Sequence, residues 1–172
     1  MFFKKWYFLL IILLSVNMNS CKTKEISHEN YGILNLTKIK IGETDYYITL
    51  PENWYIVNSY WRYGYMYYIV SDEKEIGDTI HGVIDFFHKN VHAYTEHELN
   101  LNKFICSVTA EIFMNIRRWE IYYSKNDEYF SFLTICNENK DGIETYINLV
   151  AEGKTKDEVI EMIAVYSSLI KN

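Results

Sequence analysis

The sequence predicts an α+β domain in which helices cover an antiparallel β-sheet. Several segments alternate apolar and polar residues with the period of a strand. Two other segments carry apolar residues at helical spacing, and each follows a capping-box pair. Apolar residues make up 49% of the chain, aromatic residues 17%, and there is a single proline. This composition is typical of a folded domain with a real core.

The first twenty residues have the order of an export signal. Lys4 and Lys5 precede the uncharged run 6–16, and the small residue Ser20 stands directly before Cys21. The apolar run is about half of the ~20 residues that a membrane-spanning helix needs. We therefore expect residues 1–20 to be a signal peptide that is removed.

The end of this signal resembles the lipobox of bacterial lipoproteins, with Met18 and Ser20 upstream of Cys21. The resemblance implies that Cys21 is lipidated and becomes the mature N-terminus, anchored in the membrane by its acyl chains. The alternative is an ordinary secretory signal with a cysteine near its end. Lys22 stands where enterobacterial lipoproteins retained at the inner membrane carry Asp. The expected location is the bacterial cell envelope, either facing the periplasm or in the outer membrane.

The mature chain is acidic. Removal of residues 1–20 takes away two lysines and no acid, which leaves 15 basic and 23 acidic residues and a net charge of −8. Such a surface is repelled by nucleic acid and by anionic headgroups, so only the lipid is expected to hold the protein at the membrane. About 150 residues suit one domain. We expect a polar tether over 21–37 and a single α+β domain over 38–172.

The strands before residue 90 include the most aromatic part of the chain. In 46–50, Tyr46, Ile48 and Leu50 share one face, Pro51 ends the strand, and the next strand begins at Trp54. A regular strand over 60–70 would place on one face a set of aromatic residues, namely Trp61, Tyr63, Tyr65 and Tyr67. Because tyrosine and tryptophan are enriched at binding hot spots, these four residues are the predicted partner-binding site. The same residues also suit a sheet core.

The rest of the chain is expected to form a strand, a helix, three strands and a second helix. A strand over 80–87 precedes the first helix, over 96–115, which follows the Thr95 and Glu98 capping pair. Strands over 117–123, 128–136 and 143–151 are expected to pair as an antiparallel meander. Thr155 and Glu158 form the second capping pair, before a helix whose apolar residues continue to Ile170.

Three segments together resemble the PsbP-like superfamily: 46–54, 144–149 and 155–169. That superfamily includes small envelope lipoproteins of the DcrB type. The resemblance implies a PsbP-like α/β/α sandwich and a non-enzymatic accessory or binding protein.

Motifs for catalysis, metals and cofactors are incomplete. His81, His88, His92 and His97 lie close in sequence, and His92 has helical spacing to Glu96, but neither Cys-x-x-Cys nor His-Glu-x-x-His completes a site. Gly-x-Ser-x-Gly and glycine-rich phosphate loops are also missing from the sequence. We expect no cofactor and no enzymatic activity.

Asp85 lies in an apolar strand, where an acid faces either solvent or a cleft with a shifted pKa. Adjacent Arg117 and Arg118 would point to opposite faces of a strand, so only one could hold a carboxylate. On the predicted helix Cys106 points away from the apolar face, and we expect no essential disulfide with Cys136.

The expected function is that of a lipid-anchored, non-catalytic envelope protein that binds another protein as an accessory, adaptor or toxin-immunity factor. The alternative is a small-ligand-binding protein or hydrolase with a cleft near Asp85 and His81.

Overall fold

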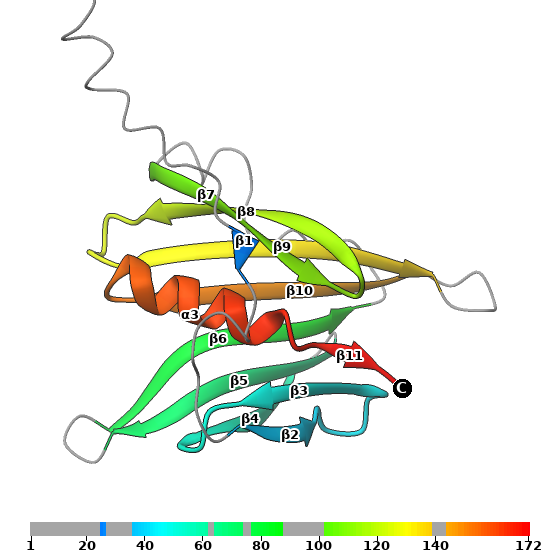
Figure 1. Cartoon of the computed structure of the whole chain (residues 1–172). Coiled ribbons are helices and arrows are strands. Elements are labelled where there is room, and N and C mark those ends of the chain that lie inside the picture. The colour runs from blue at the N-terminus through cyan, green and yellow to red at the C-terminus, as the bar shows by residue number, and fades with distance from the viewer. Residues whose placement is uncertain (1–24, 27–35, 62–63, 74–76, 88–101, 139–143) are drawn as a thin grey trace, which may run out of the picture.

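The computed structural model describes residues 25–26, 36–61, 64–73, 77–87, 102–138 and 144–172. An eight-stranded sheet runs in the order β1-β7-β8-β9-β10-β6-β5-β4, and a three-stranded sheet in the order β11-β3-β2 (Figure 1). The bounds are β1 Glu25–Ile26, β2 Thr37–Lys40, β3 Tyr46–Leu50, β4 Trp54–Trp61, β5 Gly64–Glu73, β6 Gly77–Phe87, β7 Lys103–Ile112, β8 Asn115–Tyr123, β9 Tyr129–Glu138, β10 Glu144–Gly153, α3 Lys156–Tyr166 and β11 Ile170–Lys171.

The predicted fold class is wrong. The described residues form a mostly β structure of two sheets, antiparallel apart from the pairing of β1 with β7, and α3 is the one helix among them. A single helix cannot cover a sheet of eight strands on both sides. The described residues therefore do not form the α/β/α sandwich implied by the PsbP-like resemblance.

The predicted helix over 96–115 accounts for most of this error. Residues 103–112 form β7, which pairs with β8, while 96–101 lie outside the described residues. The side chains at alternating positions of β7 are buried, namely Cys106, Val108, Ala110 and Ile112. Their period of two belongs to a strand, and it coexists in the sequence with the helical spacing of the larger apolar residues.

The turn between β7 and β8 uses two residues in the left-handed region. Phe113 has φ 51° and Met114 has φ 59°, and the Asn115 side chain donates a hydrogen bond from Nδ2 to the Phe113 carbonyl, 2.8 Å away. Two residues with positive φ match the right-handed twist of a hairpin, but this turn normally carries asparagine or glycine. The sequence therefore gave no hairpin signal here.

The predicted strand over 46–50 is confirmed as β3. Tyr46, Ile48 and Leu50 are buried and the residues between them are half-buried, and Pro51 follows the strand. The three-stranded sheet packs on the large sheet, because Ile48 and Leu50 share one hydrophobic core with Ile69 and Ile84 of that sheet.

The C-terminal helix is confirmed with a shorter extent than predicted. Thr155 caps α3 by accepting a hydrogen bond from the Glu158 amide at 3.2 Å, and Glu158 Oε2 accepts from the Lys154 amide at 2.7 Å. The helix ends at Tyr166. Ile170 then lies in β11, opposite Tyr47 of β3, so the last residues complete the small sheet.

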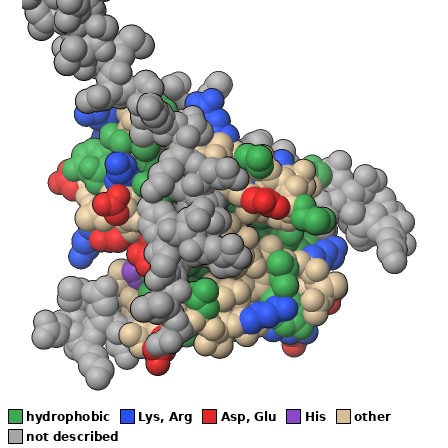
Figure 2. Space-filling view, viewed as in Figure 1, with side chains coloured by type: hydrophobic (Ala, Val, Ile, Leu, Met, Phe, Trp, Pro, Cys, Tyr) green, Lys and Arg blue, Asp and Glu red, His purple; other side chains and the backbone are tan. Residues whose placement is uncertain are grey.

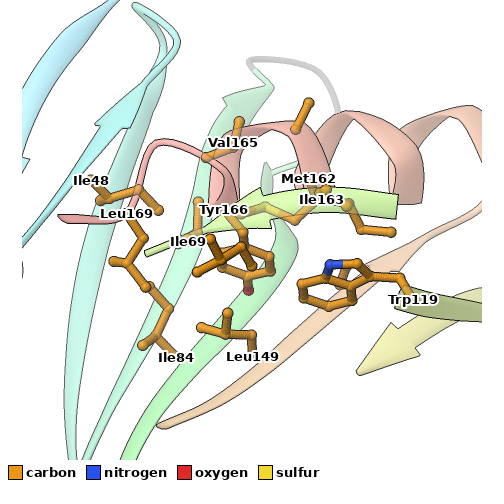
Figure 3. Close-up of a cluster of buried hydrophobic side chains, with 14 of the residues drawn as sticks. Ile48, Ile69, Ile84, Trp119, Leu149, Met162, Ile163, Val165, Tyr166 and Leu169 are labelled. Carbon is orange, nitrogen blue, oxygen red and sulfur yellow. The ribbon is translucent and has the colours of Figure 1, made fainter. Parts of the chain in front are cut away.

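Helix α3 covers one face of the eight-stranded sheet, which we call the helix face. Tyr166 is fully buried there, and its ring stacks on Trp119 with centroids 5.7 Å apart (Figure 3). Its hydroxyl lies within 2.6 Å of the Val150 carbonyl and 3.0 Å of the Val83 carbonyl. Gly82 makes this approach possible, because a Cβ there would collide with the Tyr166 hydroxyl.

The opposite side of the large sheet is called the outer face. The predicted meander of three strands is confirmed as β8, β9 and β10, and β10 continues to β6. Asp85 and Asn148 point to the outer face, since their neighbours in sequence, Ile84 and Leu149, belong to the core on the helix face.

The predicted tether also contains β1, which pairs in parallel with Thr109 and Ala110 of β7.

Candidate functional site

The residues of the predicted aromatic face do not lie on one strand. Trp61 belongs to β4, whereas Tyr65 and Tyr67 belong to β5, the next strand of the hairpin. Strand β4 ends at Trp61 and β5 begins at Gly64. Tyr67 is a core residue, 1% exposed, with its ring edge-on to Phe86 at 5.9 Å, and burial raises its pKa. Tyr65 is 43% exposed and stacks on Tyr67. The side chain of Trp61, and Tyr63 altogether, lie outside the described residues.

Exposed apolar side chains instead gather on the outer face at the β4 end of the sheet. Tyr55, Val57 and Ile80 are 37%, 41% and 45% exposed. Tyr55 lies opposite Val70, and Val70 lies opposite Ile80, so one row crosses three strands, although Val70 itself is buried. We call Tyr55, Val57 and Ile80 the apolar patch.

The apolar patch arises from the alternation of β4. Trp54 and Ile56 pack against the core on the helix face, which turns Tyr55 and Val57 outward. Val57 lies opposite Tyr68 of β5, so a second apolar row runs beside the first. In the sequence, the outward residues are as apolar as the inward ones. The alternation therefore could not show which set is solvent-exposed.

Asp85 is a buried acid at the centre of the outer face. It lies opposite Met66 on one side and Asn148 on the other, and it is 9% exposed. Asn148 Oδ1 accepts a hydrogen bond from Thr134, whereas Asp85 Oδ1 is buried with no hydrogen-bond partner. Burial therefore raises the pKa of Asp85 to about 6.

His81 lies on the other side of the sheet from Asp85. The pairing of β5 with β6 shifts register between Ile69 and Val70, which leaves His81 as an extra residue. Its ring stacks on Trp54 with centroids 4.1 Å apart, and Nε2 lies 2.7 Å from the Ser71 hydroxyl. Trp54 packs against the helix-face core, so the structure does not bring Asp85 and His81 together in one cleft.

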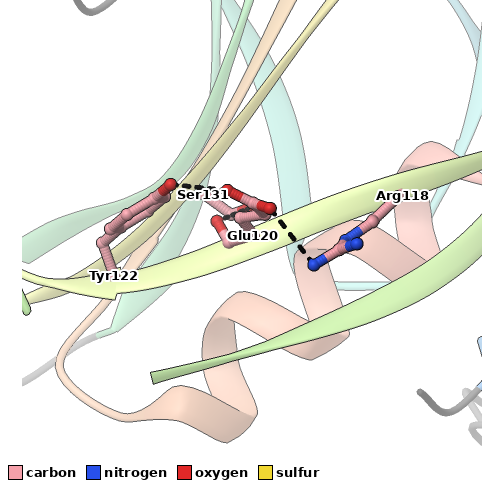
Figure 4. Close-up of polar contacts among 4 residues, drawn as sticks. All are labelled: Arg118, Glu120, Tyr122 and Ser131. Atoms are coloured by element: carbon pink, nitrogen blue, oxygen red, sulfur yellow. Dashed lines mark hydrogen bonds and ion pairs between the residues drawn. The ribbon is translucent and has the colours of Figure 1, made fainter. Parts of the chain in front are cut away.

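A polar cluster lies on the outer face of β8. Glu120 is 3.3 Å from Arg118 and accepts a hydrogen bond from the Tyr122 hydroxyl at 2.6 Å (Figure 4). Burial and this hydrogen bond raise the pKa of Tyr122 to about 12. Ser131 of β9 donates to the Glu120 carbonyl at 2.8 Å and so ties β8 to β9. The polar groups of the cluster are thus partners of one another, and we interpret the cluster as structural.

The other candidate residues are placed as follows. Within the described ranges no group of three or more His, Cys, Asp or Glu side chains could hold a metal ion, and His88, His92, Glu96 and His97 lie outside those ranges. Cys106 is buried in β7 and Cys136 is exposed on β9, two strands away, and no disulfide joins them.

Two further findings concern the surroundings of the domain. Cys21 lies outside the described residues, and in the part of the chain that is described no helix is both long and apolar enough to cross a bilayer. On the side of the molecule that carries α3, acidic, basic and apolar side chains are interspersed among the described residues (Figure 2).

No protein-family model matches the chain, and no curated protein matches it.

Proposed function

We propose that the protein is a lipid-anchored protein of the bacterial cell envelope, without catalytic activity of its own, which binds another protein through the apolar patch. The observation that carries the proposal is that Tyr55 and Val57 of β4 and Ile80 of β6 gather on one face of the sheet, with Val70 of β5 buried between Tyr55 and Ile80. Single exposed apolar side chains are common on monomers, whereas contiguous ones mark interaction sites.

The patch has the chemistry of an interface centre. A tyrosine beside two β-branched side chains offers apolar area on a rigid sheet, where few side-chain rotamers are lost on binding. The acidic balance of the mature chain, −8, suits a partner that has a basic surface around its own apolar contact. The anchor would hold the domain where such envelope partners are.

The anchor is tested by the substitution Cys21→Ala. Wild-type protein should incorporate labelled palmitate and fractionate with membranes, whereas the variant should take up no label and be released or remain an uncleaved precursor. Labelling of the Cys21→Ala variant would show acylation at another residue and would exclude Cys21 as the anchor.

The binding site is tested by the substitution Ile80→Ala in the full chain, used as bait on envelope extracts with quantitative mass spectrometry. Loss of a hot-spot side chain commonly costs ~2 kcal/mol, so the partner recovered with wild type should fall about thirtyfold. The matched control is Met114→Ala, because Met114 is 91% exposed but lies in the β7–β8 turn. Equal recovery with wild type and Ile80→Ala would exclude the patch.

A variant that combines Asp85→Asn with His81→Ala tests whether binding depends on the alternative site. Because these side chains lie on opposite faces and outside the patch, partner recovery should be unchanged in the folded variant. Loss of recovery in this variant alone would favour the ligand-binding or hydrolase alternative.

A further inference from the structure

Strand β4 is an edge strand of unusual composition. It is eight residues long, reads Trp-Tyr-Ile-Val-Asn-Ser-Tyr-Trp, and contains neither a charged residue nor a proline. It pairs with β5 over its full length without a register shift. On its other side it pairs with no strand among the residues that the structure describes.

The other edge strands of the two sheets are protected against pairing. β1 and β11 have two residues each, and β11 includes Lys171. β2 has four residues, of which Lys38 and Lys40 are charged. Short strands and lysines are the usual devices that keep sheet edges from joining other chains, and β4 has neither.

We infer that β4 is the self-association site of this protein, where a second copy of the chain adds its own β4 in antiparallel orientation. Edge-to-edge pairing would join two eight-stranded sheets around a two-fold axis that runs perpendicular to the sheet. The inference goes beyond the proposed function and does not depend on the lipid anchor. It uses Tyr55 and Val57, two of the three residues of the apolar patch, whereas Ile80 lies in β6, away from this edge.

The two-fold axis restricts the register. Each β4 residue must lie opposite a residue that points to the same face of the sheet. One residue of β4 therefore lies on the two-fold axis, opposite the same residue of the second copy. With Ile56 opposite Ile56 of the second copy, Tyr55 lies opposite Val57 of the second copy, and the same pair forms twice. An aromatic residue opposite a β-branched one is a favourable cross-strand pair. The exposed outer-face side chains of the two chains thus cover one another.

Charge does not prevent a second copy from pairing at this edge. Two acidic molecules of the same sequence repel each other over most of their surfaces, since the whole chain has a net charge of −6. An uncharged strand is a place where identical chains can meet without placing like charges opposite each other. Pairing between two β4 strands also needs no particular side chain, because the backbone of each strand supplies both hydrogen-bond donors and hydrogen-bond acceptors.

The test is the chain mass of the full-length protein by light scattering, with micelles in large excess over chains if detergent is present. Wild type should reach twice the chain mass as concentration rises. Val57→Lys and Asn58→Lys place a charge on β4 at exposed positions on opposite faces, and each should raise the dimer dissociation constant at least tenfold. Ile80→Lys is the matched control, since Ile80 is equally exposed but lies in β6, away from the edge.

The outcomes separate the possibilities. Loss of the dimer in both β4 variants with a normal dimer in Ile80→Lys supports pairing through β4, provided circular dichroism shows folded variants. A wild-type protein that stays monomeric up to ~100 μM overturns the inference. So does a dimer that survives both β4 substitutions, and a dimer lost in Ile80→Lys would indicate packing between outer faces instead. The chain mass is measured on the purified protein alone, so these outcomes are distinguishable from the capture of another protein by the apolar patch.

Discussion

Replacing Asp85 by asparagine should stabilise the protein in a strongly pH-dependent way. The carboxyl group is 9% exposed in the middle of the outer face, and its Oδ1 has no hydrogen-bond partner. Burial raises its pKa from the ordinary value of 3.8 to about 6. The folded protein therefore holds this proton more tightly than the unfolded chain does.

The sign and size of the effect follow from linkage. Between pH 3.8 and about 6 the unfolded chain has lost the Asp85 proton while the folded protein keeps it, so stability falls as pH rises. Below this range Asp85 is protonated in both the folded and the unfolded state, and the wild type has the full stability that it loses as the pH rises. The total change corresponds to about 3 kcal/mol, of which roughly 2 kcal/mol falls between pH 4 and pH 7.5.

The assay is urea unfolding of wild type and Asp85→Asn at pH 4 and at pH 7.5. The free energy of unfolding of the variant minus that of wild type should increase by roughly 2 kcal/mol from the lower to the higher pH. Effects of all other titrating groups cancel in this difference. Glu111→Gln, at an exposed position of β7, is the control and should change by less than ~0.5 kcal/mol. A pH-independent difference for Asp85→Asn would refute the reasoning.

Three further substitutions test the packing around α3 and the small sheet by urea or thermal unfolding. Thr155→Ala removes the helix cap and should cost about 1 kcal/mol, with Thr155→Ser as a near-neutral control. Tyr166→Phe removes the buried hydroxyl that donates to the Val150 carbonyl and should cost about 1 to 3 kcal/mol; an unchanged stability would mean that this hydrogen bond contributes nothing. Gly42→Ala should cost at least about 1 kcal/mol, because Gly42 has φ +52° and a Cβ there would meet the Tyr67 hydroxyl at 2.5 Å and ring carbons at 2.6 and 2.8 Å. A stable Gly42→Ala protein would contradict the packing of the small sheet on Tyr67.

Local patterns predicted those elements whose signals lie within a few residues. The alternation of 46–50 and the Thr155 cap correctly gave β3 and the start of α3. Residues 103–112 carry two periods at once, and the strand period rests partly on Cys106 and Ala110, whose small side chains weigh little in a hydrophobic pattern. Local sequence could not choose between them.

Burial of individual tyrosines depends on contacts between distant segments. Tyr65 and Tyr67 are the same residue type on the same face of β5, yet only Tyr67 lies beneath the loop at Gly42 and becomes a core residue. The pairing of β5 with β6 likewise decides where His81 points. In a regular strand His81 and Asp85, four residues apart, would share a face. The register shift places them on opposite faces. Gly82, beside His81, is a glycine inside the strand and therefore a signal of a bulge, but it does not show which side chain changes face.

Photo-crosslinking in cells tests the proposed binding role most directly. A crosslinking amino acid at position 80, within the apolar patch, should yield a discrete adduct with another protein of the cell envelope, heavier or lighter than a self-adduct of twice the chain mass. The same group at position 114, in the exposed β7–β8 turn, should yield no such adduct. Absence of an adduct at position 80, or the same adducts at both positions, would contradict binding through the patch.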